Sequence, residues 1–285
     1  MKKSNVIYQL SEQSLSQMMS YIIQTKDDKF IIIDGGTEND TAYLLEFLSK
    51  LEGYNNIING WILTHAHHDH INAFMDVISN HKGKINIKNI YYNFPEAAFI
   101  QQYEPQYAHT IQEFNALLPA FQDKCTIITD GDKIKFDEII FDIMSSPDDM
   151  ITQNAINNSS IVLKMHVDGQ SVLFLGDLGI EAGDKILLKY GKKGLKSDIV
   201  QMAHHGQNGV GKNVYEAINA KVCLWNTPKW LWNNDAGAGV NTGPWKTVAV
   251  RTWMNELKVS HHFITKDGTC KISFPMNLWN KDNDF

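Results

Sequence analysis

The chain has 285 residues, 43% of them hydrophobic and 20% charged, which is the composition of a globular protein with a sizeable core. A formal net charge of −6 at pH 7 disfavours tight binding to duplex nucleic acid, which needs a basic face. Three scattered cysteines argue against a disulfide framework, and without a signal peptide or a membrane-length apolar run we expect a cytoplasmic protein that does not enter membranes.

Short apolar runs predict the strands of the fold. In chain order they are KFIIID (29–34), GWILT (60–64), KINIKNIYY (84–92), CTIIT (125–129), EIIFDIM (138–144), SSIVLKMHV (159–167), SVLFLGD (171–177), SDIVQMA (197–203), AKVCLW (220–225), HHFIT (261–265) and CKISF (270–274). Asp-Gly pairs at Asp168-Gly169 and Asp267-Gly268 predict two tight hairpins, because both positions of such a turn accept positive φ.

Amphipathic segments between these strands predict the helices. They cover 40–53, 71–79, 109–121, 180–190, 213–219 and 246–257. The strands form an early and a late group, each followed by helices. This order favours an α/β (α+β) protein in which two mixed sheets pack face to face between helices, a four-layer αββα sandwich. We treat residues 1–285 as a single domain.

The segment ILTHAHHDHINAF (62–74) holds four histidines and an aspartate within six positions. Residues two apart in an extended chain point the same way, so His65 and His67 share one side just after a strand. Asp69 and His70 lie where the next helix begins, so the turning chain can direct them toward the same point. Neutral imidazole and carboxylate predict a divalent-metal site for one or two ions, with zinc as the first choice and manganese or iron as alternatives.

This segment carries a family resemblance. Residues 64–70, THAHHDH, match the HxHxDH signature of the metallo-β-lactamase superfamily. IIIDGG (31–36) resembles the family's early strand, whose aspartate, here Asp34, supports the metal site from behind. VLFLGDLG (172–179) resembles the strand that delivers a bridging aspartate, here Asp177. DIVQMAHHG (198–206) resembles the segment that supplies the last histidine, here His204 or His205.

The resemblance implies the metallo-β-lactamase fold and a set of metal ligands. The strings NNSSIVLKM, LFLGD and HHG, in this order, are most similar to the soluble hydrolase domain of the ComEC-type DNA-uptake channel and its free-standing relatives. The ligands implied are His65, His67, Asp69, His70, Asp177 and His204. His205 is then a catalytic candidate that contacts a substrate anion, and the reverse assignment of the two histidines stays open.

The sequence departs from the family at one ligand. Dinuclear members carry another histidine before the bridging aspartate, whereas this chain reads IMSSPDD there, with Ser145, Ser146 and Pro147. His166 alternates with the apolar side of its strand and is expected to face solvent, and His109 lies in a helical stretch. We therefore expect the first metal to have only two histidines, Asp177 and water, and to bind more weakly than in a complete site.

A divalent ion lowers the pKa of bound water, and two ions bridged by Asp177 would hold a hydroxide and stabilise the leaving oxygen of a phosphoester. Asp69 is the candidate for steering the hydroxide and relaying its proton. Asp34 and Thr64 are suitable partners for orienting the ligands.

Tryptophans beside the loop NNDAGAGVNTG (233–243) suggest an aromatic wall over a pocket. Trp230 and Trp232 are the predicted lid residues, and core packing is the alternative.

Three functions remain open at this stage. The first is a phosphoester hydrolase, either a phosphodiesterase of small molecules or a nuclease, acting on a small-molecule or single-stranded substrate. The second is a hydrolase of esters, thioesters, lactones or β-lactams. The third is a non-catalytic metal-binding module, which the incomplete first site makes credible.

Overall fold

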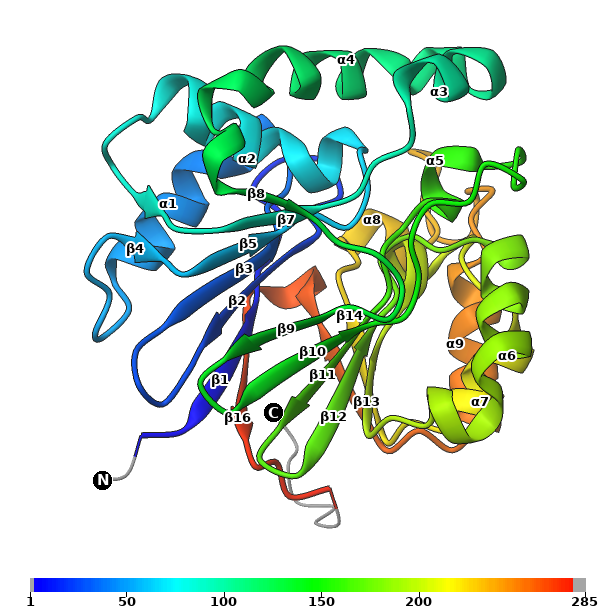
Figure 1. Ribbon diagram of the computed structural model, residues 1–285. Helices are drawn as coiled ribbons and strands as arrows, with labels where there is room; N and C mark the ends of the chain where they lie inside the picture. The colour runs from blue at the N-terminus through cyan, green and yellow to red at the C-terminus, as the bar shows by residue number, and fades with distance from the viewer. Residues whose placement is uncertain (1–2, 279–285) are drawn as a thin grey trace.

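The computed structural model describes residues 3–278. Two seven-stranded sheets pack face to face, and helices cover the outer face of each sheet (Figure 1). The predicted four-layer αββα sandwich is therefore confirmed. No helix within residues 3–278 has the length and apolar content that a bilayer crossing requires.

The first sheet has the order β16-β1-β2-β3-β5-β7-β8. It is antiparallel from β16 to β3 and parallel from β3 to β8. Its strands are β1 (Asn5–Gln9), β2 (Ser20–Gln24), β3 (Phe30–Asp34), β5 (Gly60–Ile62), β7 (Ile90–Tyr92), β8 (Cys125–Ile127) and β16 (Cys270–Phe274). The short strands β4 (Ile57–Ile58) and β6 (Asn86–Ile87) pair separately.

The second sheet has the order β15-β14-β13-β12-β11-β10-β9 and is likewise half parallel, from β12 to β15. Its strands are β9 (Lys133–Phe136), β10 (Ile139–Ile143), β11 (Leu163–Val167), β12 (Gln170–Phe174), β13 (Ile199–Gln201), β14 (Val222–Trp225) and β15 (His261–Ile264).

Helices α1 (Thr41–Ser49), α2 (His68–Asn80), α3 (Ala97–Tyr103) and α4 (Ala108–Leu117) lie on the side of the first sheet (Figure 1). On the other side, α6 (Ile180–Leu195), α7 (Lys212–Ile218) and α9 (Thr247–Glu256) cover the second sheet. The short helices α5 (Ala155–Asn158) and α8 (Lys229–Trp232) lie among the loops at one end of the sandwich.

One of the two predicted hairpins is confirmed, and two other predicted features of the strands differ from the structure. The Asp168-Gly169 hairpin is confirmed, with φ of 47° and 77° at its two residues. The Asp267-Gly268 hairpin is wrong, because β15 belongs to the second sheet and β16 to the first, so the chain crosses between the sheets there. The segment 84–92 is also two strands, β6 and β7, which lie in different sheets.

Strands β1 and β2 were not predicted, although every residue in them is buried. Polar residues interrupt their apolar runs, and the fold supplies partners for those polar groups. Gln9, for example, donates its side-chain amide to the side-chain oxygen of Asn226 at 3.1 Å. A buried polar group is tolerated when it is hydrogen-bonded, so tertiary structure overrides the local pattern.

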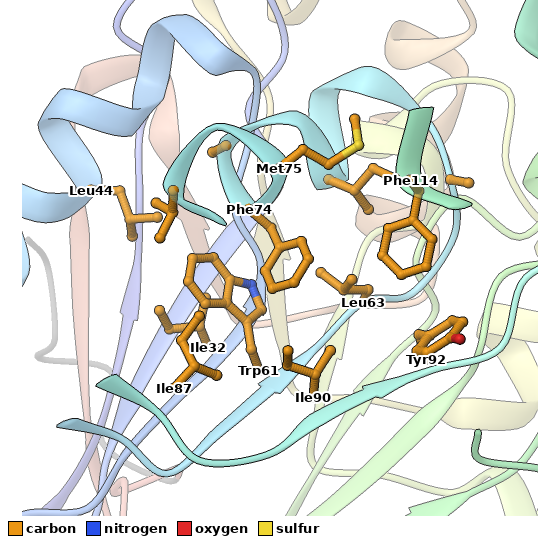
Figure 2. Close-up of a cluster of buried hydrophobic side chains, with 14 of the residues drawn as sticks. Ile32, Leu44, Trp61, Leu63, Phe74, Met75, Ile87, Ile90, Tyr92 and Phe114 are labelled. Carbon is orange, nitrogen blue, oxygen red and sulfur yellow. The ribbon is translucent and has the colours of Figure 1, made fainter. Parts of the chain in front are cut away.

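The core between the first sheet and its helices includes Leu63 and Ala66, which flank the start of the histidine segment. Figure 2 shows part of this core. Trp61 on β5 and Phe74 on α2 pack edge to face, with ring centroids 5.1 Å apart. Both rings are fully buried. The indole nitrogen of Trp61 also donates to the backbone oxygen of Asp34 at 2.7 Å. This packing fixes the end of β3 relative to β5 and α2, and four of the six candidate ligands lie on α2 or in the loop that joins it to β5.

Candidate metal centre

The candidate ligands come from loops that follow strands of both sheets. His65 and His67 lie between β5 and α2, and Asp69 and His70 lie in the first turn of α2. Asp177 follows β12, and the two histidines at 204 and 205 follow β13. The sandwich therefore brings residues more than 100 positions apart to one end of the two sheets.

Two groups of side chains could each hold a cation. His65, His67 and Asp177 form the first, and Asp69, His70 and His205 form the second. Within each group the ligand atoms all lie within 4.8 Å of one another. All six residues are buried, with relative exposures between 0% and 8%.

Asp177 lies between the two groups. Its Oδ2 is 3.9 Å from His65 Nε2 and 3.5 Å from His205 Nε2. Its Oδ1 is 3.2 Å from His70 Nε2. Ligand atoms around one cation, each about 2 Å from it, are separated by roughly 3–4 Å. These spacings suit a carboxylate shared by two cations.

The donor atoms fit cations because they are buried and converge on one place. His65 Nε2 and His67 Nδ1 lie 3.2 Å apart. Within residues 3–278, the Nε2 atoms of His70 and His205 and the Oδ1 of Asp177 are shielded from solvent, and each lies 3.2 Å from another candidate ligand. Imidazole nitrogen with carboxylate oxygen is the set that zinc, manganese and iron accept.

A fully buried carboxylate orients the histidine segment from behind. Asp34 Oδ2 accepts hydrogen bonds from His70 Nδ1 at 2.8 Å and from Thr64 Oγ1 at 2.7 Å. Asp34 Oδ1 accepts the backbone N–H of Thr64 at 2.8 Å. The hydrogen bond to His70 Nδ1 leaves Nε2 to face the site, which is the usual arrangement behind a metal-binding histidine.

Residues 157–160, the NNSS string, hold the loop that carries Asp177. Ser160 Oγ accepts the backbone N–H of Asp177 at 3.0 Å. Asn158 Oδ1 accepts the backbone N–H groups of Gly179 and Ala182 at 3.0 and 3.2 Å, at the start of α6. These side chains position Asp177 without touching the ligand groups.

The histidines fall into two classes by pKa, which burial lowers in one class and nearby carboxylates raise in the other. Burial lowers the pKa of His67 to about 4 and that of His65 well below its usual range, so both rings are neutral at pH 7. Burial also lowers the pKa of His205, but nearby carboxylates, Asp177 first, outweigh it and raise the pKa to about 9. The pKa of His70 is raised in the same way against burial.

Cation binding at pH 7 is therefore expected to release protons. The raised pKa values mean that His70 and His205 hold protons below their folded-state pKa when no cation is bound. A ligand nitrogen must be neutral, so a cation bound to the second group expels protons from these rings, and the share released by His205 fades as the pH rises past about 9. Calorimetric titration with zinc in buffers of different ionisation enthalpy measures the number of protons released. No net release at pH 7 would contradict the assignment.

The two adjacent histidines have different places in the site. His205, which the sequence analysis assigned to a substrate anion, lies in the second group, with Nε2 3.2 Å from Asp69 Oδ2. Its Nδ1 donates to the backbone oxygen of Asn226 at 2.9 Å. His204, the predicted ligand, belongs to neither group, although its Nε2 is 3.8 Å from Asp177 Oδ2. The geometry therefore favours His205 as the ligand and His204 as the residue that contacts a substrate anion.

The turn that presents these histidines is conformationally costly. His204 and His205 have φ values of 52° and 55°, and two successive non-glycine residues in the left-handed region are uncommon. Gly206 follows with φ of 76°, and a Cβ there would collide with the Trp225 ring. Such strain persists where the surrounding structure imposes it, most often at functional sites.

In the segment where the family carries a histidine, Ser145 does not replace that ligand, because its hydroxyl is used in other hydrogen bonds. Ser145 Oγ donates to the backbone oxygen of Ser160 at 2.8 Å and accepts the backbone N–H of Val162 at 2.9 Å. His166 faces solvent as expected, with its side chain 44% exposed and paired to Asp142 at 2.9 Å. His109 is exposed on α4.

Sequence reasoning missed one residue beside the site. Tyr107, just before α4, packs edge-on against His67 with ring centroids 4.5 Å apart. It comes from the helical segment between β7 and β8, and nothing in the local pattern separates it from an ordinary surface tyrosine.

The two predicted lid tryptophans each pack against another tryptophan. Trp232 packs edge-on against Trp225, at 5.3 Å between ring centroids, and carries the Arg251 guanidinium 4.5 Å over its ring. Trp230 packs against Trp245 at 4.9 Å. The lid role of both residues stays a prediction.

Comparison with known proteins agrees with this geometry. The family model of the metallo-β-lactamase superfamily matches residues 15–209. ComE operon protein 3 of Bacillus subtilis (strain 168) is 25% identical over 176 residues, which are 60% of this chain and 20% of that protein. The chain thus corresponds to about a fifth of the length of that relative.

Solved structures share the fold. The metallo-β-lactamase fold protein YhfI from Bacillus subtilis has a TM-score of 0.53 at 12% identity, over 93% of this chain and 99% of YhfI. A diphosphatase of the PhnP family has a TM-score of 0.50 at 13% identity, over 95% of this chain and 98% of that one. The segment that the family model matches contains every member of the two ligand groups, and the chain belongs to the metallo-β-lactamase superfamily.

Proposed function

We propose that this chain is a divalent-metal-dependent phosphoester hydrolase, a phosphodiesterase for small or single-stranded substrates. The observation that carries the proposal is the position of Asp177 between two ligand groups, with oxygens 3.2–3.9 Å from histidines of both. Two cations held by these residues would suit displacement at phosphorus, where charge develops on both the attacking and the leaving oxygen. The net charge of −6 favours small or single-stranded substrates over duplexes.

When bound, the cations supply an activated water near neutral pH and polarise an oxygen of the substrate. The side chains of the protein orient the bound groups and exclude bulk water. Asp69 stays ionised, because its interactions with His205 and His70 outweigh the effect of burial and hold its pKa below the usual range. Its carboxylate can then bind a cation in the second group and accept a hydrogen bond from water, which orients that water. His204, with its side chain 20% exposed, is the histidine of the site most open to an entering substrate.

One solved structure of this fold is a diphosphatase, which supports a phosphorus-centred substrate for this chain. The donor set alone also accommodates carbon-centred esters.

The test is a parallel assay of the zinc-, manganese- and iron-loaded protein. The substrates are bis(p-nitrophenyl) phosphate, p-nitrophenyl acetate, a thioester, a lactone and a chromogenic cephalosporin. Turnover of the phosphodiester that disappears with chelator is the expected result. Turnover of acyl substrates alone, or of none with any of the three metals, contradicts the proposal.

His204 is expected to strengthen the first cation's binding, because its nitrogen approaches the same Asp177 oxygen that faces His65. His204→Gln should lower zinc affinity at one of two sites by about 10- to 100-fold, the range seen when a supporting partner of a metal site is lost. Isothermal titration measures both sites, with His68→Gln, an exposed neighbour, as control. Equal affinities in the wild type and His204→Gln would show that His204 does not serve the cation.

A further inference from the structure

A second pocket lies beside α9, at the ends of β14 and β15. It has a volume of about 380 Å³. Its lining contains no member of the two ligand groups. The lining residues that matter here are Trp225, Trp232, Val248, Arg251, Asn255 and His262. The volume is at the lower end of the range for small-molecule sites, which is about 300–1,000 Å³.

Arg251 is the single arginine of the chain, beside 25 lysines. Its guanidinium carbon lies 4.5 Å over the Trp232 ring, and its Nε is buried without a hydrogen-bond partner in the described part of the chain. No carboxylate within residues 3–278 approaches it to 4.0 Å. A guanidinium is a planar fork that matches a carboxylate through two parallel hydrogen bonds, which a lysine cannot provide.

A neutral amide and an apolar wall complete the pocket. Trp225 Nε1 donates to His262 Nδ1 at 3.0 Å, and the His262 ring is also hydrogen-bonded to the backbone at Val259, so both rings use their polar groups within the protein. Asn255 adds an amide group at the lining, while Trp232 and Val248 supply apolar surface. The single guanidinium of Arg251, beside a neutral amide, balances one negative charge better than the two charges of a phosphate monoester.

We propose that this pocket binds a small organic monocarboxylate, with the carboxylate on Arg251 and the apolar part of the ligand against Trp232 and Val248. The site is separate from the metal centre and does not depend on the proposed hydrolase activity. Arg251 is its specificity-determining residue, because only its side chain offers a formal positive charge in the lining.

The experiment is isothermal titration of the metal-loaded protein with benzoate and phenylacetate, and with benzamide as the neutral analogue. Both carboxylates are expected to bind and benzamide is not. Arg251→Met and Arg251→Lys should weaken binding by about 10- to 100-fold, since hydrogen bonds to a charged partner are lost. Lys246→Met, an exposed charge change at the start of α9, is the matched control and should bind as the wild type does.

Thermal melting and metal content establish that each variant is folded, and the two arginine substitutions serve as independent tests. The proposal is overturned if neither carboxylate binds or if benzamide binds as tightly as benzoate. It is also overturned if a folded Arg251→Met protein retains wild-type affinity, or if inorganic phosphate binds the wild type more tightly than either carboxylate and loses that affinity in Arg251→Met. Each of these outcomes leaves the phosphodiesterase assay unaffected.

Discussion

Asp177→Ala is expected to abolish hydrolysis and to lower the metal content of the purified protein sharply. Asp177 offers both carboxylate oxygens to the site, one toward His70 and one toward His65 and His205. Alanine removes an anion that compensates the charge of either cation in a buried site. We expect turnover to fall by roughly 1,000-fold or more, because the chemistry depends on the paired cations.

Metal analysis and turnover of Asp177→Ala should be compared with Asp149→Ala, which removes an exposed aspartate and should change neither quantity. Asp177→Asn tests charge separately from shape, since it keeps one oxygen in place. If Asp177→Ala retained wild-type metal content and turnover, Asp177 would not be the shared ligand.

Asp34→Ala is expected to have the largest effect on stability. The Asp34 carboxylate is fully buried and receives three hydrogen bonds, two from Thr64 and one from His70. Removing one partner from such a buried network costs about 3–5 kcal/mol. The loss also frees the His70 ring to rotate, so zinc affinity should fall by about 10- to 100-fold.

Asp34→Asn removes the negative charge but keeps a side chain that tolerates the backbone conformation at this position. Asp34 has φ of 56°, a region that asparagine tolerates better than alanine. Urea unfolding in the presence of chelator measures stability without the contribution of bound metal. Asp34→Ala should unfold at the lowest urea concentration and Asp34→Asn at an intermediate one. A change of less than about 1 kcal/mol in Asp34→Ala would mean that the network does not support the fold.

The parts of the site that lie close together in sequence could be predicted. His65, His67, Asp69 and His70 occupy a strand end and the first turn of a helix, where local geometry alone makes them converge. The fold class followed from the grouping of strands and helices. Asp177 was placed only by resemblance, because no local rule joins a residue after β12 to a loop after β5.

What could not be predicted depends on tertiary contacts. The choice between His204 and His205 rests on two left-handed residues and on the backbone oxygen of Asn226, which the neighbouring sequence does not specify. The turn after β15 resembles a hairpin, yet the following strand pairs with β1 at the other end of the chain. Trp232 contacts an arginine 19 positions away along the chain, which no periodicity indicates.

The proposed activity requires two divalent cations that share one carboxylate at the end of the sandwich. A crystal structure of the zinc-loaded protein, with anomalous data on both sides of the zinc edge, tests this directly. Two anomalous peaks are expected, each about 2.0–2.2 Å from an Asp177 oxygen, one beside the rings at positions 65 and 67 and one beside the rings at 70 and 205. A map without a peak at coordination distance from Asp177 would contradict it.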